Sequence, residues 1–190
     1  MITGIQPGLD WRGILQRVPR HPFVAEIYAA EAAKDANIPI GHGVYASKPS
    51  TIARMLDLLG PCHRVLEIGT GCGWQTALLT LQAQEVFSIE YIHGLYERST
   101  RDLRALGYDV TTRHGDGFAG WPEHAPFDGI IAACAVPVIG DGLLAQLSIG
   151  GRIVAPVGDA STQRIVRITR TATGIETEDH GPAGFTAARH

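Results

Sequence analysis

Short apolar segments rich in β-branched residues alternate with helical segments from residue 63 to residue 157. The predicted strands are residues 63–68, 85–90, 109–113, 128–133 and 152–157, and the predicted helices between them are 74–83, 92–106 and 140–148. This alternation is typical of successive β-α-β units, in which parallel strands are joined by helices. The sequence therefore predicts an α/β fold with a doubly wound, mostly parallel sheet.

The C-terminal part of the chain departs from this alternation. Two further predicted strands, 163–169 and 175–179, flank the short connection Thr171–Gly174. Two strands joined in this way are typical of an antiparallel hairpin. We therefore expect an antiparallel C-terminal hairpin at the edge of the sheet. The last ten residues, GPAGFTAARH, show little pattern.

The N-terminal part precedes the sheet and has a different pattern. Residues 11–36 are predicted to be helical, in two pieces that are interrupted at Pro19 and Pro22. Residues 38–49 are rich in glycine and proline and are predicted to form a loop before a helix over 50–59. The prediction is a single domain, residues 1–190, with an N-terminal helical cap (1–60) and a sheet core (61–190).

The composition limits the compartment and the partners. The chain has 190 residues, 45% of them hydrophobic, and a formal net charge of -3, so we expect no broad basic surface for nucleic acid. The longest apolar run, residues 130–139, is too short to span a bilayer. The N-terminus does not resemble a signal peptide, and three cysteines without a CxxC pair favour neither disulfides nor a zinc site. We expect a cytoplasmic protein without a metal, bound to neither nucleic acid nor membrane, and of unknown oligomeric state.

A glycine-rich segment, Gly69-Thr70-Gly71-Cys72-Gly73, follows the first predicted strand of the sheet. Glycine lets the main chain approach a ligand closely, and the N-terminus of the next helix offers free N–H groups. A P-loop would continue with Lys-Ser/Thr, but Trp74 and Gln75 follow here. The third glycine also falls one position early for the GxGxxG dinucleotide pattern. The segment predicts a ligand site, in which Cys72 serves as a small residue.

Three acidic residues are expected near this loop, at the carboxyl edge of the sheet. Glu67 precedes the glycines, Glu90 ends the next strand, and Asp116 follows the third strand, beside Gly117. Ligands of open α/β sheets bind in the crevice at this edge. A carboxylate at Glu90 can accept hydrogen bonds from both ribose hydroxyls, and Asp116 can accept one from an adenine amino group. Glu67 favours a cationic ligand over a pyrophosphate, so the three acids together predict an adenosine-bearing cation.

Longer motifs surround the glycine-rich loop. They are Arg17-Val-Pro-Arg-His-Pro-Phe-Val24, Ile38-Pro-Ile-Gly-His-Gly43, Val65-Leu-Glu-Ile-Gly-Thr-Gly71, Gly115-Asp-Gly117 with Gly120-Trp-Pro-Glu-His-Ala-Pro-Phe-Asp128, and Gly150-Gly-Arg-Ile-Val-Ala-Pro-Val-Gly158. Together they closely resemble the protein-L-isoaspartate (D-aspartate) O-methyltransferase family, nearly without gaps from about Arg17 to Gly158. The glycine loop occurs in many methyltransferases, whereas the IPIGxG and GDG…GWPEHAPFD segments resemble this family alone.

The resemblance implies a Rossmann-like methyltransferase sheet, S-adenosyl-L-methionine as the methyl donor, and a peptide or protein carrying isoaspartate as the acceptor. In this family the methyl ester closes to a succinimide that hydrolyses partly to normal aspartate, so the implied role is protein repair. The expected cofactor-binding residues are Glu67, Gly69, Thr70, Gly71, Cys72, Gly73, Glu90, Asp116 and Gly117.

The acceptor side is expected on the segment before the sheet. Ser47 is the candidate catalytic residue, because its hydroxyl can hydrogen-bond the acceptor carboxylate and orient one oxygen toward the methyl group; it can also cap the helix over 50–59. Tyr45, Ala46, Lys48 and Val136 are candidate acceptor contacts, although Tyr45 can equally have a packing role and Lys48 a solvated one.

The sequence departs from the usual family pattern on this acceptor side. The family usually reads Gln-Thr-Ile-Ser-x-Pro after Gly43, where this chain has Val44-Tyr-Ala-Ser-Lys-Pro49. Two alternatives therefore remain open. A specialised relative would esterify a small-molecule or ribosomal-peptide carboxylate, and a cofactor-binding domain would bind the donor without methylating.

Overall fold

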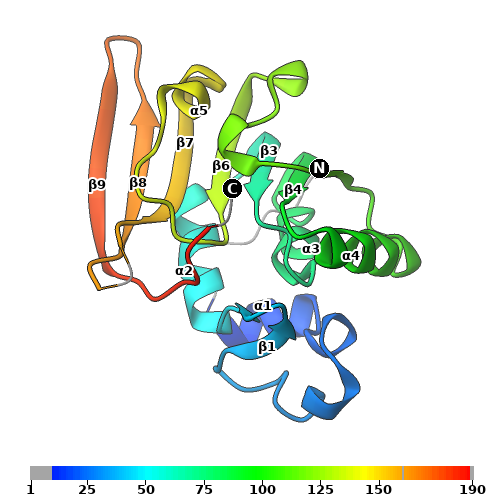
Figure 1. The fold of residues 1–190 in the computed structure, drawn as a ribbon. Coiled ribbons are helices and arrows are strands. Elements are labelled where there is room, and N and C mark those ends of the chain that lie inside the picture. The colour runs from blue at the N-terminus through cyan, green and yellow to red at the C-terminus, as the bar shows by residue number, and fades with distance from the viewer. Residues whose placement is uncertain (1–9, 160, 189–190) are drawn as a thin grey trace.

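A seven-stranded mixed sheet forms the centre of the structure, a computed structural model that describes residues 10–159 and 161–188. The strand order is β5-β4-β3-β6-β7-β8-β9, and Figure 1 shows β9 at one edge, beyond β8. The parallel strands are β3 (Cys62–Ile68), β4 (Ala83–Glu90), β5 (Thr111–His114), β6 (Phe127–Ala132) and β7 (Leu147–Val157), and the antiparallel strands are β8 (Arg164–Arg170) and β9 (Ile175–Pro182). The predicted α/β class, with a mostly parallel sheet and an antiparallel C-terminal hairpin, is confirmed.

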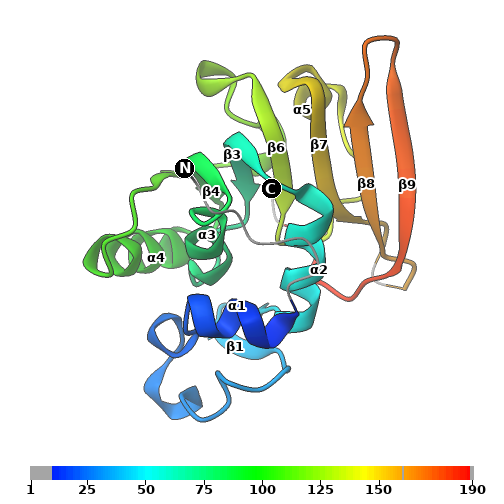
Figure 2. The ribbon, with the colours of Figure 1, turned by 180° about the vertical axis from the view of Figure 1, so that it is seen from behind.

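Both faces of the sheet are covered, as the pattern of its strands requires. The helices are α1 (Trp11–Arg17), α2 (Pro49–Leu59), α3 (Trp74–Leu79), α4 (His93–Ala105) and α5 (Asp141–Ala145). Successive side chains of a strand point to opposite faces, so Val65 packs in the core that includes residues of α1 to α4, and Leu66 packs in the core that includes Leu143 of α5. Figure 2 shows α2 in front of the sheet, next to α1.

Two predicted helices are shorter than expected because the following strands begin early. The helix predicted over 74–83 ends at Leu79, and β4 already begins at Ala83. The helix predicted over 140–148 ends at Ala145, because Leu147 begins β7 and pairs with Phe127. In the part of the chain that the structure describes, every helix is too short or too polar to span a bilayer.

The prediction for residues 11–36 is confirmed for the first helical piece and is wrong for the second. The helix α1, capped by the Asp10 carboxylate, ends at Arg17, and two short 3-10 helices follow, His21–Phe23 and Glu26–Tyr28. Pro19 lies between α1 and these turns, and Pro22 lies inside the first turn. The interruption at the two prolines is therefore as predicted, because a proline ring removes a main-chain donor and clashes with the preceding turn. The error lies after Pro22, where short 3-10 helices replace the predicted second helical piece.

The loop predicted over residues 38–49 is also corrected by the structure. It contains an antiparallel hairpin of two short strands, β1 (Ile38–Gly41) and β2 (Val44–Ala46). Gly41, His42 and Gly43 turn the chain with φ of 95°, 54° and 73°. Glycine reaches this left-handed region without strain, which explains the two glycines of the IPIGHG motif. The glycine and proline content had suggested a loop, but pairing between the two short segments decides the outcome.

Candidate active site

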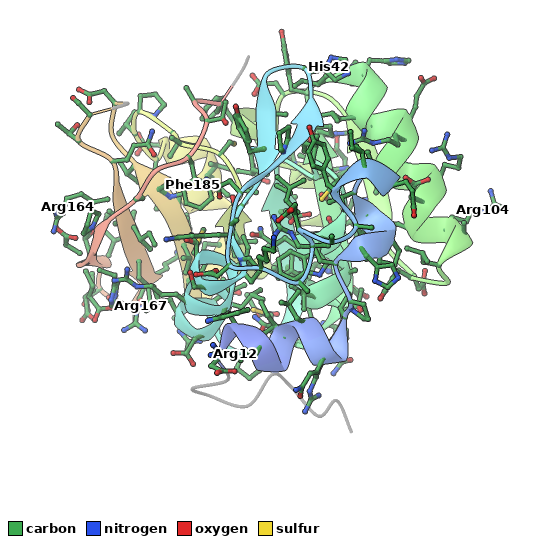
Figure 3. The ribbon with its side chains drawn as sticks, turned by 90° about the horizontal axis from the view of Figure 1, so that it is seen from below. Arg12, His42, Arg104, Arg164, Arg167 and Phe185 are labelled. Carbon is green, nitrogen blue, oxygen red and sulfur yellow. The ribbon has the colours of Figure 1, made fainter. Side chains whose placement is uncertain are left out.

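A cleft opens at the carboxyl ends of β3, β4 and β6, the edge at which open α/β sheets bind ligands. The space between its walls, including the part that is open to solvent, is about 1090 Å³. Its walls come from the loops after these strands, the β1–β2 hairpin and the C-terminal segment 184–188. Figure 3 looks onto this edge and shows the hairpin, with His42 at its tip, beside the segment that carries Phe185.

The glycine-rich loop lines the cleft with its main chain. Gly69, Gly71 and Gly73 have φ of 90°, 57° and 89°, a region that side chains disfavour. A Cβ atom on Gly73 would lie 3.1 Å from Cγ of Leu103, so this glycine also lets the loop approach α4. Residues 69–72 line the cleft, and Thr70 and Cys72 among them are buried. The predicted loop residues therefore come together at the cleft, with Gly73 directly behind them.

Glu90 lies at the end of β4 and lines the cleft although only 5% of its surface is exposed. The Gly71 N–H donates a 2.8 Å hydrogen bond to its Oε2, and the Ile92 N–H donates a 2.9 Å hydrogen bond to its Oε1. The two bonds fix the orientation of the carboxylate and attach it to the glycine loop. Each oxygen keeps a second lone pair for a ligand. Glu90 is the one charged side chain among the described residues that line the cleft, so the cleft favours a cation.

Glu67 is completely buried and lies behind the loop instead of in the cleft wall. Thr76 and Ser88 donate hydrogen bonds to its Oε2, and Ser88 in turn is 2.6 Å from the hydroxyl of Thr70, which lines the cleft. Burial raises the pKa of Glu67 from 4.5 to about 7, against the lowering effect of these hydroxyls, and Glu90 raises it further. The expectation that all three acids line one crevice is therefore wrong for Glu67: it reaches the cleft through two hydroxyl groups.

The third strand contributes Gly117 and Asp116 in different ways. Gly117 lines the cleft, and a Cβ atom there would lie 2.4 Å from Cγ2 of Ile68, so no larger residue fits without a shift. Asp116 is exposed, is not part of the cleft wall, and accepts a 2.8 Å hydrogen bond from the Phe118 N–H. The expectation that all three acids line one crevice is therefore not met by Asp116 either, although its neighbour Gly117 is part of the cleft wall.

Three of the candidate acceptor residues line the cleft. Tyr45 and Ala46 come from β2 and Ser47 directly follows this strand; Tyr45 is 55% exposed and Ser47 is partly buried. Ser47 is not the cap of α2, because the N-cap is Lys48, which makes no side-chain capping bond. Asn37 supplies an acceptor instead, since its Oδ1 receives the Lys48 N–H at 2.9 Å.

Two other acceptor candidates lie outside the cleft wall. Lys48 is exposed, and its main chain begins α2. Val136 is completely buried in the core beneath the loop after β6, and its N–H donates to the Pro156 carbonyl at 2.9 Å. The prediction that Val136 contacts an acceptor is therefore wrong. Its neighbour Cys134 lines the cleft in its place.

The family model of protein-L-isoaspartate(D-aspartate) O-methyltransferase (PCMT) matches residues 10–187 of the chain. The chain belongs to this family. The match includes the β1–β2 hairpin, the glycine-rich loop and most of the C-terminal segment, so almost every wall of the cleft lies within it.

Relatives with the name Protein-L-isoaspartate O-methyltransferase are similar over most of the chain. One from Xanthomonas axonopodis pv. citri (strain 306) is 44% identical over 174 residues, which are 90% of this chain and 77% of the relative. One from Xanthomonas campestris pv. campestris (strain B100) is 44% identical over 186 residues, 96% of this chain and 82% of the relative.

Solved structures with this family name share the fold. A protein-L-isoaspartate O-methyltransferase superposes with a TM-score of 0.86 at 25% identity over 96% of this chain, and the chain spans 62% of the length of that protein. A Plasmodium falciparum PCMT, solved in complex with S-adenosyl-L-homocysteine, superposes with a TM-score of 0.80 at 21% identity over 96% of this chain and 91% of its own.

The resemblance to the family also places Gly184-Phe-Thr-Ala187 on the acceptor side, and this C-terminal segment of the PCMT family member is a wall of the cleft. Residues 184–188 line the cleft although their sequence shows little pattern. The Gln163 side chain holds them: its Oε1 accepts the Phe185 N–H at 2.7 Å, and its Nε2 donates to the Phe185 carbonyl at 2.9 Å. The Ala135 N–H donates to the Thr186 carbonyl at 2.9 Å. Neither the sequence pattern nor the resemblance indicated that Gln163 holds this segment.

Proposed function

We propose that this PCMT family member transfers a methyl group from S-adenosyl-L-methionine to a carboxylate of an isoaspartyl residue in a peptide or damaged protein. Its family, and the names of relatives 44% identical to it, support this reaction. The observation that carries the proposal is the cleft itself, because the glycine-rich loop, Glu90 and Ser47 line one cavity. A donor and an acceptor bound there would meet in the same space.

The residues of the cleft fit the donor in charge and in shape. Glu90 supplies a negative charge for a cationic sulfonium compound, and its lone pairs suit ribose hydroxyls. Gly69 and Gly71 carry no side chains, which leaves room beside Glu90 for the donor. Gly117 likewise adds no side chain to the cleft wall next to Ile68. Asp116, next to Gly117, would hold an adenine amino group. When bound, S-adenosyl-L-methionine supplies a methyl group that its positive sulfur has already activated.

A carboxylate acceptor needs orientation more than it needs a base. Holding two reactants in attack geometry can lower the activation free energy by roughly 7–11 kcal/mol. The Ser47 hydroxyl would donate a hydrogen bond to one carboxylate oxygen and leave the other free to attack. Among the described residues of the cleft wall no lysine or arginine is present, so no ion pair would weaken the nucleophile.

Two cysteines also line the cleft and could compete as acceptors, but both thiols stay protonated. Burial raises the pKa of Cys134 to about 12, and Glu90 and Glu67 raise it further. Burial likewise raises the pKa of Cys72. Because the thiolate is the nucleophilic form, neither sulfur competes with a carboxylate at neutral pH. Tyr45 and Ala46 would then form the acceptor-facing part of the hairpin, with exposed Lys48 beyond them.

The identity of the acceptor is tested by incubating the protein with methyl-labelled donor and each of three substrates in parallel. These are an isoaspartyl peptide, its normal aspartyl twin, and a cell extract. Base-labile label on the isoaspartyl peptide alone supports the proposal. Label in the extract alone would indicate a specialised relative with a small-molecule or ribosomal-peptide acceptor, and tight donor binding without any label would indicate a domain that does not methylate.

A cytoplasmic location is part of the proposal. The three cysteines are free thiols in the structure, and a reducing compartment keeps thiols in that form. Fractionation of cells that produce the tagged protein tests this directly. Recovery with a membrane or extracellular fraction would contradict it.

A further inference from the structure

The Arg17–Val24 motif contributes nothing to the wall of the cleft, yet it holds a buried arginine close to it. Arg20 is 1% exposed and lies between the end of α1 and the first 3-10 helix. Burying a charge is costly unless all of its surroundings are arranged for it. A completely buried arginine in a motif without a role in the site therefore requires an explanation.

The guanidinium of Arg20 binds main-chain carbonyls on two separate segments. Nη2 donates to the carbonyls of Ala46 and Ser47, each at 2.9 Å. Nη1 donates to the carbonyl of Ala36 at 2.9 Å. Ala36 lies between Asp35 and Asn37, whose side chains accept the N–H groups of Ser50 and Lys48 at the start of α2. Arg20 thus fixes Ser47 directly and its flanking main chain indirectly.

The same guanidinium also contacts the donor side of the cleft. Its Cζ lies 5.2 Å from the ring centre of Trp74, the first residue of α3 after the glycine-rich loop. The Trp74 ring is fixed in turn, because its Nε1 donates to the Val18 carbonyl at 3.0 Å. Trp74 lines the cleft, as Ser47 does. One side chain therefore connects the loop that would hold the donor with the segment that would hold the acceptor.

We propose that Arg20 is a positioning residue for methyl transfer. It sets the separation between the Ser47 segment and the glycine-rich loop, because it hydrogen-bonds the first and contacts Trp74 directly after the second. This inference rests on the proposed function. Arg20 is not part of the cleft wall, so it acts through Ser47 and Trp74 and not by contact with either reactant. The planar guanidinium has several N–H donors in fixed directions and so reaches the carbonyls of Ala36, Ala46 and Ser47 at once. The single ammonium group of lysine cannot make all of these hydrogen bonds in the same geometry.

The test compares Arg20→Lys with Arg152→Lys. Arg152 is the control, because it is partly buried, donates a 2.8 Å hydrogen bond to the main-chain carbonyl of Leu59, and lies outside the cleft wall. Single-turnover methylation of the isoaspartyl peptide at saturating donor and acceptor gives the rate, and calorimetry with S-adenosyl-L-homocysteine gives cofactor affinity. A misplacement of about 1 Å can cost on the order of 100-fold in rate. We therefore expect the rate to fall by about tenfold to 100-fold in Arg20→Lys, with little change in cofactor affinity or in KM. Arg152→Lys should show no such fall.

Hydrogen exchange provides a readout that does not need activity. Amide exchange in a peptide covering residues 44–52 should accelerate in Arg20→Lys and stay at the parent rate in Arg152→Lys. If Arg20→Lys does not fold, Arg20→Gln replaces it, since an amide can still donate to one carbonyl without burying an unpaired charge.

Parental transfer rates in Arg20→Lys, or equal losses in both variants, would overturn the positioning role. If the parent protein labels no isoaspartyl peptide, the proposed function fails instead, and exchange then decides the role of Arg20. Unchanged exchange over residues 44–52 would overturn it.

Discussion

Glu90→Gln separates the charge of the cleft from its shape. In the parent, the two carboxylate oxygens each accept one main-chain N–H, from Gly71 at 2.8 Å and from Ile92 at 2.9 Å. A glutamine of the same size has one acceptor oxygen, so its NH₂ group must face one of these two donors. We expect the glycine-rich loop or the start of the following turn to lose its anchor, and the cleft to lose its negative charge.

The size of the effect follows from these bonds. A hydrogen bond to a charged group contributes about 1.5–3 kcal/mol, and leaving one buried N–H unpaired costs about 1–3 kcal/mol of folding free energy. Losing one charged contact to a ribose hydroxyl therefore weakens cofactor affinity by about 10- to 100-fold. The variant should unfold at a lower temperature but remain folded at room temperature.

Calorimetric titration with S-adenosyl-L-methionine and with S-adenosyl-L-homocysteine measures this affinity, and thermal unfolding measures stability. Glu85→Gln is the matched control, because Glu85 lies on the same strand but is ion-paired with Arg64 at the surface. It should bind both ligands as the parent does. Parental affinity in Glu90→Gln, or the same loss in Glu85→Gln, would refute the reasoning.

Three further predictions concern residues around the cleft. The pKa of Glu67 is raised to about 7 from an ordinary 4.5. Between these two pH values the folded protein binds more protons than the unfolded chain, so the free energy of unfolding should fall as pH rises from 4.5 to about 7. Glu67→Gln should flatten that dependence in urea unfolding at about pH 5 and about pH 8, and an unchanged slope would show that another group is responsible. Gly117→Ala should destabilise the protein by about 1–3 kcal/mol through overpacking against Ile68 and reduce cofactor affinity, and a parental melting temperature would contradict the 2.4 Å contact. Ser47→Ala should slow methyl transfer while cofactor affinity holds, and equal rates in variant and parent would remove Ser47 from the mechanism.

Several features of the fold and site could be predicted from neighbouring residues alone. The β-branched strands and the helices between them follow from periodicity, and the ligand site at the glycine-rich loop follows from the lack of side chains on its glycines. The position of Glu90 at the end of a parallel strand was sufficient to predict that it reaches the ligand crevice. These predictions succeed because each depends on local conformation or on one general property of parallel sheets.

The remaining features depend on contacts between residues far apart in the chain. Whether Val136 faced the cleft or the core was decided by the bridge to Val157, and a hairpin replaced a loop because Ile38 pairs with Ala46. The wall at Phe185 exists because Gln163 binds its main chain. Local sequence specifies which conformations a segment prefers, but it carries no information on which distant group satisfies its polar atoms. The sequence by itself thus determined the sheet and the loop of the donor site, and the tertiary structure decided what surrounds the acceptor.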